Sequence, residues 1–209
     1  PPSEIQAMFA PGVDLVPLVD DRRHLTGIAL NRSDELRIGR HRVGGDAPAV
    51  LISEIGINHQ GSIEFAKELV DLSAEAGADI VKFQLRDMDA LYRQGAGASG
   101  GEDLGPQYTL DLLAKYNLTA EQLFEVFDHC RRVGVEVMCT PWDAPSVDRL
   151  VEYGVPALKF ASADLTNHAL VRHAVGKGMP LVLSTGMSTE AEIQETVSLL
   201  RSLGASYAM

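Results

Sequence analysis

Charged and amide side chains that could bind an anion stand inside short apolar segments of the chain. Lys82 and Gln84 belong to the run IVKFQ (80–84), and Lys159 belongs to ALKFAS (157–162). Side chains two residues apart in a strand share a face, so Lys82 and Gln84 should point the same way. A cation beside a neutral donor suits a phosphate or a carboxylate. These segments therefore predict an anion-binding site.

Three hydroxyl side chains extend this set along the chain. Thr140 closes the run VEVMCT (135–140), Ser162 closes the run that holds the second lysine, and Ser184 closes LVLS (181–184). Each hydroxyl taken singly is more often a turn or cap residue than a ligand contact. Their recurrence at successive segment ends, with two lysines and an amide, predicts one rim that binds a compact, doubly anionic molecule.

An acidic residue, Glu54, stands in the otherwise apolar run VLISEIG (50–56). Ionising a carboxylate in such a run costs free energy unless a cation or hydrogen-bond donors stabilise it. Two interpretations stay open: a structural acid paired with a neighbouring lysine, and a functional carboxylate at the mouth of the fold. His59, just beyond this run, could contact a substrate, help to hold a metal or stabilise the turn.

The elements that must position these residues follow a repeated phrase, in which an amphipathic stretch ends at a glycine and a short apolar run follows. The phrase occurs five times, at Gly77, Gly134, Gly154, Gly178 and Gly204. Glycine ends a helix easily because it adopts the left-handed conformation. Helices that alternate with apolar strands predict βαβ units and a parallel sheet, with the chemistry at the strands' carboxyl ends.

The number of strands bears on the fold. The runs that open at residues 50, 80, 135, 157 and 181 make five strands, and residues 206–209 begin a sixth. A doubly wound sheet could be complete with these strands, whereas an eight-stranded barrel needs every strand paired. The pattern alone leaves these two α/β folds open.

Segments outside the repeat suggest a division of the chain. Residues 15–30 read as two extended runs around a polar turn, and VPLVD (16–20) with LTGI (25–28) resembles the closing hairpin of a CBS-type regulatory module. The alternative is an arm that packs on the main domain. We expect a first segment over residues 1–35 and a main domain over 36–209. Residues 36–45 should form a small hairpin that could plug the bottom of a barrel.

A long insertion separates the second strand from the next helix. Residues 95–101 are rich in glycine, and 108–116 should form a short helix. An insertion of this length in a compact α/β domain is usually a lid or a substrate-binding element. Thr119 and Gln122 then form a capping box that restarts a helix.

Composition sets outer bounds on function. The chain has 209 residues, 45% of them hydrophobic, and a net charge of −11. This charge argues against nucleic acid and anionic membranes as partners, but a few buried lysines can still bind a small anion. Two cysteines without metal-ligand spacing suit a reducing cytoplasm, and Cys139 should serve packing. No stretch predicts a membrane span, so we expect a cytoplasmic protein.

Five motifs, taken together, closely resemble the N-acetylneuraminate (sialic acid) synthase family. They are SEIGINHQG (53–61), VKFQ (81–84), CTPWD (139–143), LKFAS (158–162) and LSTGM (183–187). The resemblance runs from about Leu36 to the end of the chain. It implies a (β/α)8 TIM-type barrel of the phosphoenolpyruvate-condensing kind, here truncated after about strand five or six.

The resemblance also implies an activity. Members of the family condense phosphoenolpyruvate with an open-chain N-acylated amino sugar, such as N-acetylmannosamine, to give a nine-carbon 2-keto acid and phosphate. By resemblance, Glu54 is the catalytic residue that faces the reacting carbons. The residues that would hold phosphoenolpyruvate are Lys82, Gln84, Thr140, Lys159, Ser162 and Ser184.

The rest of the family's machinery should lie outside this sequence. The resemblance implies a divalent metal, Mn²⁺ or Mg²⁺, whose histidine ligands lie beyond Met209, and we expect no metal ligands in this chain. It also implies a C-terminal domain and a homodimer when the protein is full length. We therefore expect the 209-residue chain alone to lack synthase activity.

Two other functions stay open. One is a related synthase that uses phosphoenolpyruvate to make a deoxy-octulosonate or deoxy-heptulosonate phosphate, although such enzymes usually carry extra basic residues. The other is a non-catalytic ligand-sensing fragment. The chain departs mildly from the family pattern, with Ser53 where alanine is usual and Ala163-Asp164 where glycine-glutamate is common.

Overall fold

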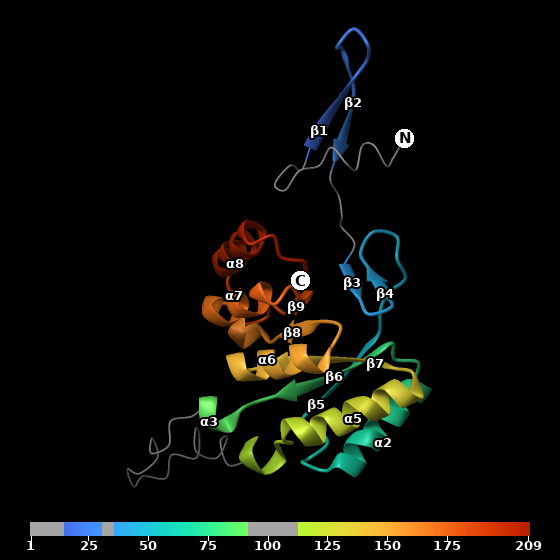
Figure 1. Ribbon diagram of the computed structural model, residues 1–209, viewed down its shortest axis with the longest axis vertical. Helices are drawn as coiled ribbons and strands as arrows, with labels where there is room; N and C mark the ends of the chain where they lie inside the picture. Colours follow the sequence, from blue (N-terminus) through green and yellow to red (C-terminus); the bar gives the residue numbers. More distant parts are fainter. Residues whose placement is uncertain (1–14, 31–35, 92–112) are drawn as a thin grey trace, which may run out of the picture.

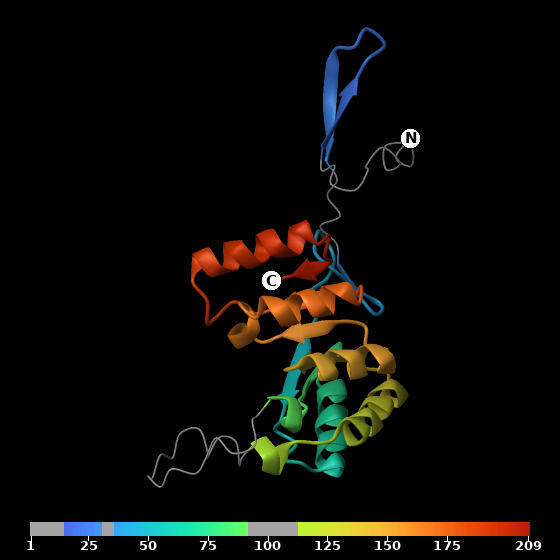
Figure 2. The ribbon, with the colours of Figure 1, turned by 60° about the vertical axis from the view of Figure 1, so that its left-hand side comes forward.

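The computed structural model describes residues 15–30, 36–91 and 113–209, and Figures 1 and 2 show it from two directions. The described part of the chain begins with two antiparallel hairpins, β1 (Leu15–Val19) with β2 (Leu25–Leu30) and β3 (Leu36–Ile38) with β4 (His41–Val43). Asp20 closes the first hairpin, because its carboxylate accepts hydrogen bonds from the backbone of Arg22 and His24, both at 2.9 Å. The predicted hairpin is confirmed. Its origin in a CBS-type module, and a domain boundary at residue 35, stay predictions.

Six parallel strands form the main sheet. They are β5 (Ile52–Gly56), β6 (Ile80–Leu85), β7 (Glu136–Pro141), β8 (Leu158–Phe160), β9 (Leu181–Leu183) and β10 (Tyr207–Ala208). Their order across the sheet is β10-β9-β8-β7-β6-β5, which follows the chain without a reversal. A doubly wound sheet reverses its strand order at a switch point, whereas a barrel adds each strand beside the last. The order therefore decides the choice that the sequence pattern leaves open, in favour of the TIM-type barrel.

Helices connect these strands, and all but the short α3 (Met88–Leu91), which follows the carboxyl end of β6, lie along one face of the sheet (Figures 1 and 2). They are α2 (Ile63–Glu75), α3 (Met88–Leu91), α5 (Ala120–Val133), α6 (Ala144–Tyr153), α7 (His168–Gly176) and α8 (Glu190–Ser202). Local signals set their ends as predicted. Ser62 caps α2, Thr119 and Gln122 form a capping box on α5, and Gly134 ends α5 with φ of 81°.

The main core lies between the helices and the outward side chains of the strands. Val81, Phe83 and Leu85 of β6 belong to it, as do Leu123 and Phe127 of α5. The rings of Phe83 and Phe127 are tilted, with centroids 5.7 Å apart. Each fully buried side chain of this size stabilises the fold by about 2–3 kcal/mol. The two-residue alternation of β6 therefore turns its polar residues, Lys82 and Gln84, away from the helices.

Both cysteines lie in this core and make no disulfide. Cys130 is on α5 and Cys139 is on β7, and both side chains are fully buried. Burial raises the pKa of the Cys130 thiol to about 12, and it also raises that of Cys139. The predicted packing role of Cys139 is confirmed.

A second, smaller core lies on the opposite face of the sheet. Leu36 and Ile38 of the β3–β4 hairpin pack there against inward side chains such as Ile80 and Met138. The turn of the hairpin is fixed by Glu136, whose carboxylate accepts a hydrogen bond from the backbone nitrogen of Arg40 at 3.4 Å. The hairpin thus covers the amino-terminal end of the strands, as the sequence predicts.

The structure describes only part of the insertion that follows β6. The glycine-rich part of the insertion and most of the helix expected over 108–116 lie outside the described residues, although 113–116 are helical. Whether the insertion is a lid stays a prediction. Within the described ranges, no helix combines the length and the apolar composition that crossing a membrane requires.

Candidate functional site

The inner face of the sheet, which the helices leave uncovered, is built in two layers. The lower layer is apolar and packs with the β3–β4 hairpin: Ile52, Ile80, Met138, Ala157 and Val182. Two residues further along each of these segments stands a polar side chain, and we call this set the polar layer: Glu54, Lys82, Thr140, Lys159 and Ser184. Because side chains alternate along a strand, the strand period alone gathers these five residues above one apolar floor.

The strand register places neighbouring members of the set side by side. Glu54 of β5 pairs with Lys82 of β6. One step further along the sheet, Gln84 of β6 pairs with Thr140 of β7. Gln84 continues the face of Lys82, so it stands at the carboxyl-terminal rim of the polar layer. The convergence predicted from the sequence is therefore present for these residues.

An ion pair joins Lys82 and Glu54. The Nζ atom of Lys82 is 2.7 Å from Oε2 of Glu54, and the lysine side chain is 7% exposed while the carboxylate is 58% exposed. The sequence suggests a carboxylate within an apolar environment; instead the lysine is buried and the carboxylate reaches solvent. Glu54 is thus both a partner for a buried cation and a group that an incoming ligand can meet, so both interpretations of it fit the structure.

The second lysine, Lys159, is half-buried, and its ammonium group is hydrogen-bonded to residues at the ends of β8 and β9. Its Nζ atom donates a hydrogen bond to the carbonyl oxygen of Phe160 at 2.8 Å and another to the hydroxyl of Ser184. Burial lowers the pKa of Lys159, repulsion from Lys82 lowers it further, and attraction to Glu54 opposes this. The three charged groups therefore act on one another across the inner face.

The side-chain amide oxygen of Gln84 is already hydrogen-bonded to other side chains of the protein. That oxygen accepts hydrogen bonds from the guanidinium of Arg86 and from the indole nitrogen of Trp142, the latter at 3.3 Å. The guanidinium also lies over the indole ring, 4.5 Å from its centroid. Sequence reasoning missed both donors. The signals were present, since Arg86 is two residues beyond Gln84 and Trp142 lies within the CTPWD motif.

The three hydroxyl residues predicted for the site differ in how the structure connects them to it. Thr140 is buried on β7, and Ser184 is hydrogen-bonded to Lys159. Ser162 belongs to a short 3₁₀ helix (Ser162–Asp164) that follows β8 at the same end of the sheet. Among the described residues, no hydrogen bond or ion pair connects Ser162 to the other candidates. Its place in the site stays a prediction.

His59 makes the turn-stabilising contact that is one of its three predicted roles; the substrate and metal roles stay predictions. Its side chain is buried, and Nδ1 accepts a hydrogen bond from the backbone nitrogen of Gly61 at 3.1 Å. Burial lowers the pKa of this imidazole, so it stays neutral more readily than a free histidine. The contact stabilises the turn between β5 and α2.

The part of the chain that the structure describes contains no cluster of side chains suited to bind a divalent metal. No group of three or more histidine, cysteine, aspartate or glutamate side chains comes together there. The described residues therefore do not fit the Mn²⁺ or Mg²⁺ that the family resemblance implies, and no chemical step below depends on one.

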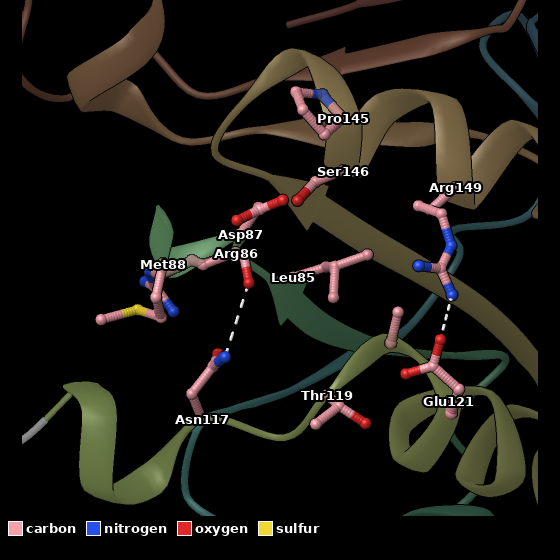
Figure 3. Close-up of a pocket in the computed structure, with 11 residues that line it drawn as sticks. Leu85, Arg86, Asp87, Met88, Asn117, Thr119, Glu121, Pro145, Ser146 and Arg149 are labelled. Atoms are coloured by element: carbon pink, nitrogen blue, oxygen red, sulfur yellow. Dashed lines mark hydrogen bonds and ion pairs between the residues drawn. The ribbon is translucent and has the colours of Figure 1, made fainter. Parts of the chain in front are cut away.

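A separate cavity of about 250 Å³ lies on the outer side of the sheet, beside the carboxyl end of β6 (Figure 3). Leu85, which faces the helices, lines it, together with Ser146 and Arg149 of α6 and Glu121 of α5. Its charges are balanced, because Arg149 is paired with Glu121 and the other two charged lining residues, Arg86 and Asp87, have opposite signs. The cavity is thus distinct from the polar layer and has no comparable excess of positive charge.

Comparisons with known proteins agree with this architecture. Over 171 residues the chain is 34% identical to the uncharacterized protein MJ1065 of Methanocaldococcus jannaschii, covering 82% of this chain and 48% of that protein. It is 31% identical to the N,N'-diacetyllegionaminic acid synthase of Legionella pneumophila, covering 76% of this chain and 45% of that enzyme. The chain thus spans about half the length of the curated relatives it matches.

A solved structure shows the same fold. The N-acetylneuraminic acid synthetase of Leptospira borgpetersenii, solved in complex with citrate, superimposes with a TM-score of 0.73 at 26% identity, covering 83% of this chain and 57% of that one. The family model named NeuB matches residues 69–209, well over half of the chain. Relatives with a stated activity, such as the Legionella enzyme, are sugar-acid synthases. The chain therefore belongs to the NeuB family.

Proposed function

We propose that this chain is part of an enzyme that condenses phosphoenolpyruvate with an open-chain N-acylated amino sugar. The products would be a nine-carbon 2-keto sugar acid and inorganic phosphate. One observation carries the proposal: Lys82 and Lys159 share the polar layer with a single opposing carboxylate, that of Glu54. Two cations and one anion leave a local excess of positive charge in a protein whose net charge is −11.

The chemistry of phosphoenolpyruvate matches this arrangement. The molecule carries a phosphate and a carboxylate on a three-carbon skeleton, so it is compact and strongly anionic. Lys82, Lys159 and the hydroxyls of Thr140 and Ser184 would hold these groups, and Ser162 would complete the set. Fixed cations and donors place the two reactants in register, which removes part of the entropic cost of their encounter.

The reaction itself asks little covalent chemistry of the protein. The methylene carbon, C3, of phosphoenolpyruvate forms a bond with the aldehyde carbon of the sugar, whose oxygen takes up a proton. Water then adds to C2, the carbon that bears the phosphate, and gives up a proton, after which the tetrahedral adduct releases inorganic phosphate and leaves the 2-keto group. Glu54 is exposed above Lys82 and would orient the sugar hydroxyl or the attacking water.

The sugar partner is inferred from the relatives. The Legionella protein is named for an N,N'-diacetylated product, which favours an N-acylated amino sugar here. The proposal also includes a cytoplasmic homodimer for the whole enzyme and a divalent metal bound by residues outside the described set. Neither nucleic acid nor a membrane is a proposed partner.

Calorimetric titration of the 209-residue chain with phosphoenolpyruvate tests the binding step. We expect saturable binding that weakens at least tenfold in both Lys82→Met and Lys159→Met, since each variant removes one cation from the site. Lys177→Met is the matched control, because Lys177 pairs with Asp148 on the helical surface. Equal loss in all three variants would contradict the proposed site. A thermal shift with adenine nucleotides but none with phosphoenolpyruvate would instead support a sensing fragment.

A further inference from the structure

The side-chain amide of Gln84 can adopt only one orientation in this structure. Its oxygen accepts hydrogen bonds from Arg86 and from the indole of Trp142. An amide oxygen has two lone pairs, and an amide nitrogen can only donate. Turning the amide over would place its NH₂ group against two N–H donors and would lose both hydrogen bonds. The protein therefore presents the nitrogen of Gln84, and not its oxygen, to the inner face.

Gly56 keeps space open beside that nitrogen. A Cβ atom built on Gly56 would lie 3.3 Å from Nε2 of Gln84, and the glycine has φ of +58°. An L-residue would be strained at this φ, and its side chain would crowd the amide. The glycine at the end of β5 thus leaves the amide donors accessible from the polar layer.

The two donors are themselves held in place. The Arg86 guanidinium lies over the Trp142 ring. The side-chain nitrogen of Asn117 donates to the Arg86 carbonyl oxygen at 3.4 Å, as Figure 3 shows. The backbone nitrogen of Trp142 donates to the carbonyl oxygen of Leu85 at 3.2 Å, which ties the end of β7 to β6. Arg86 and Trp142 are therefore held in the positions from which they donate to Gln84.

We propose that Arg86 and Trp142 are positioning residues that hold Gln84 as a donor-only contact, and that this contact selects the carboxylate of the three-carbon substrate. The inference rests on the proposed function. Lys82 and Lys159 would take the phosphate, and the amide of Gln84 would take the carboxylate, which accepts hydrogen bonds but cannot donate them when ionised. Recognition of the two anionic groups is then divided between separate side chains.

The decisive variant is Trp142→Phe, which removes the indole N–H donor while keeping a smaller aromatic ring beside Arg86. We expect the dissociation constant for phosphoenolpyruvate to rise about tenfold, the effect of one misplaced hydrogen bond to a charged group. The dissociation constant for inorganic phosphate, measured on the same preparation, should stay within about twofold, because phosphate does not need Gln84. Retained phosphate binding also shows that the variant is folded.

A double-mutant cycle separates positioning from general loosening of the site. In a Gln84→Met background, Trp142→Phe should have no further effect on phosphoenolpyruvate binding. Arg86→Met should act like Trp142→Phe. Its matched control, Arg149→Met, removes a cation from the cavity wall without contacting Gln84 and should change neither constant.

The outcomes are distinct. Parallel weakening of phosphoenolpyruvate and phosphate in Trp142→Phe, or additive effects in the cycle, would overturn the positioning role and leave the proposed function intact. A wild-type chain that binds phosphoenolpyruvate no more tightly than phosphate would remove the proposed function itself, and the carboxylate contact with it.

Discussion

At the scale of single residues, the polar layer depends on charges that compensate one another unequally. Lys82 is buried against the exposed carboxylate of Glu54, whereas Lys159 is half-buried and relies on a carbonyl and a hydroxyl. Neutral acceptors stabilise an ammonium less than a carboxylate does. Burial, followed by repulsion from Lys82, lowers the pKa of Lys159, so the charge of Lys159 should respond to pH.

We expect phosphoenolpyruvate affinity to fall as pH rises from neutrality toward 10.5, the ordinary lysine value, because the pKa of Lys159 lies below it. Over the same window the unfolded chain binds the proton more tightly than the folded chain, so this group makes the folded state more stable as pH rises. Lys159→Arg keeps its charge throughout and should lose less affinity. Calorimetric titrations across this window provide the measurement, and identical pH profiles for the two proteins would refute the assignment.

At the scale of elements, the β3–β4 hairpin is held by a close backbone contact. Gly39 in its turn has φ of +56°, and a Cβ atom there would lie 2.6 Å from a carboxylate oxygen of Glu136. Glu136 in turn accepts the backbone hydrogen bond of Arg40, and Arg40 donates to the carbonyl oxygen of Gly134. The hairpin is thus attached by polar contacts at its turn and by apolar side chains along its strands.

Gly39→Ala should lower the free energy of unfolding by about 2 kcal/mol, because left-handed strain is joined by the loss of the Arg40 hydrogen bond when the flexible Glu136 carboxylate moves aside. Gly77→Ala is the matched control. It has φ of +83° with nothing within 4 Å of the added Cβ atom, so it should cost only about 1 kcal/mol. Urea denaturation of both variants measures the difference. If the two variants lose equal stability, the contact with Glu136 does not constrain the turn.

Local signals made most elements predictable from the sequence. Caps such as Ser62 and Thr119, and the left-handed Gly134, act within one or two helical turns, so their effect can be read from neighbouring residues. The period of β6 likewise placed Lys82 and Gln84 on one face. Strand order across the sheet could not be read from the pattern, because it depends on pairing between distant segments; only the family resemblance indicated a barrel.

The site was predictable to the same extent. The five members of the polar layer follow from alternation within strands, whereas the exposure of Glu54 and the contacts of Gln84 depend on which strand lies alongside. Trp142 reaches Gln84 from another strand end, and no periodicity in one segment reveals such a contact. Burial of Lys82 rather than Glu54 has the same origin.

At the scale of the whole molecule, the described strands form a sheet with two outer strands, β5 and β10. Leu51, next to β5, and Leu72 on α2 are more than half exposed, at 56% and 53%. The polar layer is therefore built from one side only in the described part of the chain. The proposed phosphoenolpyruvate is small enough to be held from one side, but a large sugar would need contacts from the side opposite the polar layer.

The 209-residue chain by itself should bind phosphoenolpyruvate but show no turnover with N-acetylmannosamine. The cations proposed to hold phosphoenolpyruvate are present, whereas the described residues offer no metal cluster and no contacts for the sugar from the side opposite the polar layer. Release of inorganic phosphate from the two substrates together, followed over time, is the measurement. Sustained phosphate release by the purified chain would contradict this expectation.

Alkylation of the two buried cysteines can report when the core between α5 and β7 opens. A thiol attacks an alkylating reagent as thiolate, and burial raises the pKa of Cys130 to about 12 and also raises that of Cys139. Neither sulfur should react with iodoacetamide at neutral pH until α5 separates from β7. Mass spectrometry of the alkylated chain would then time that separation, and a ligand bound on the inner face should slow both reactions without touching either sulfur.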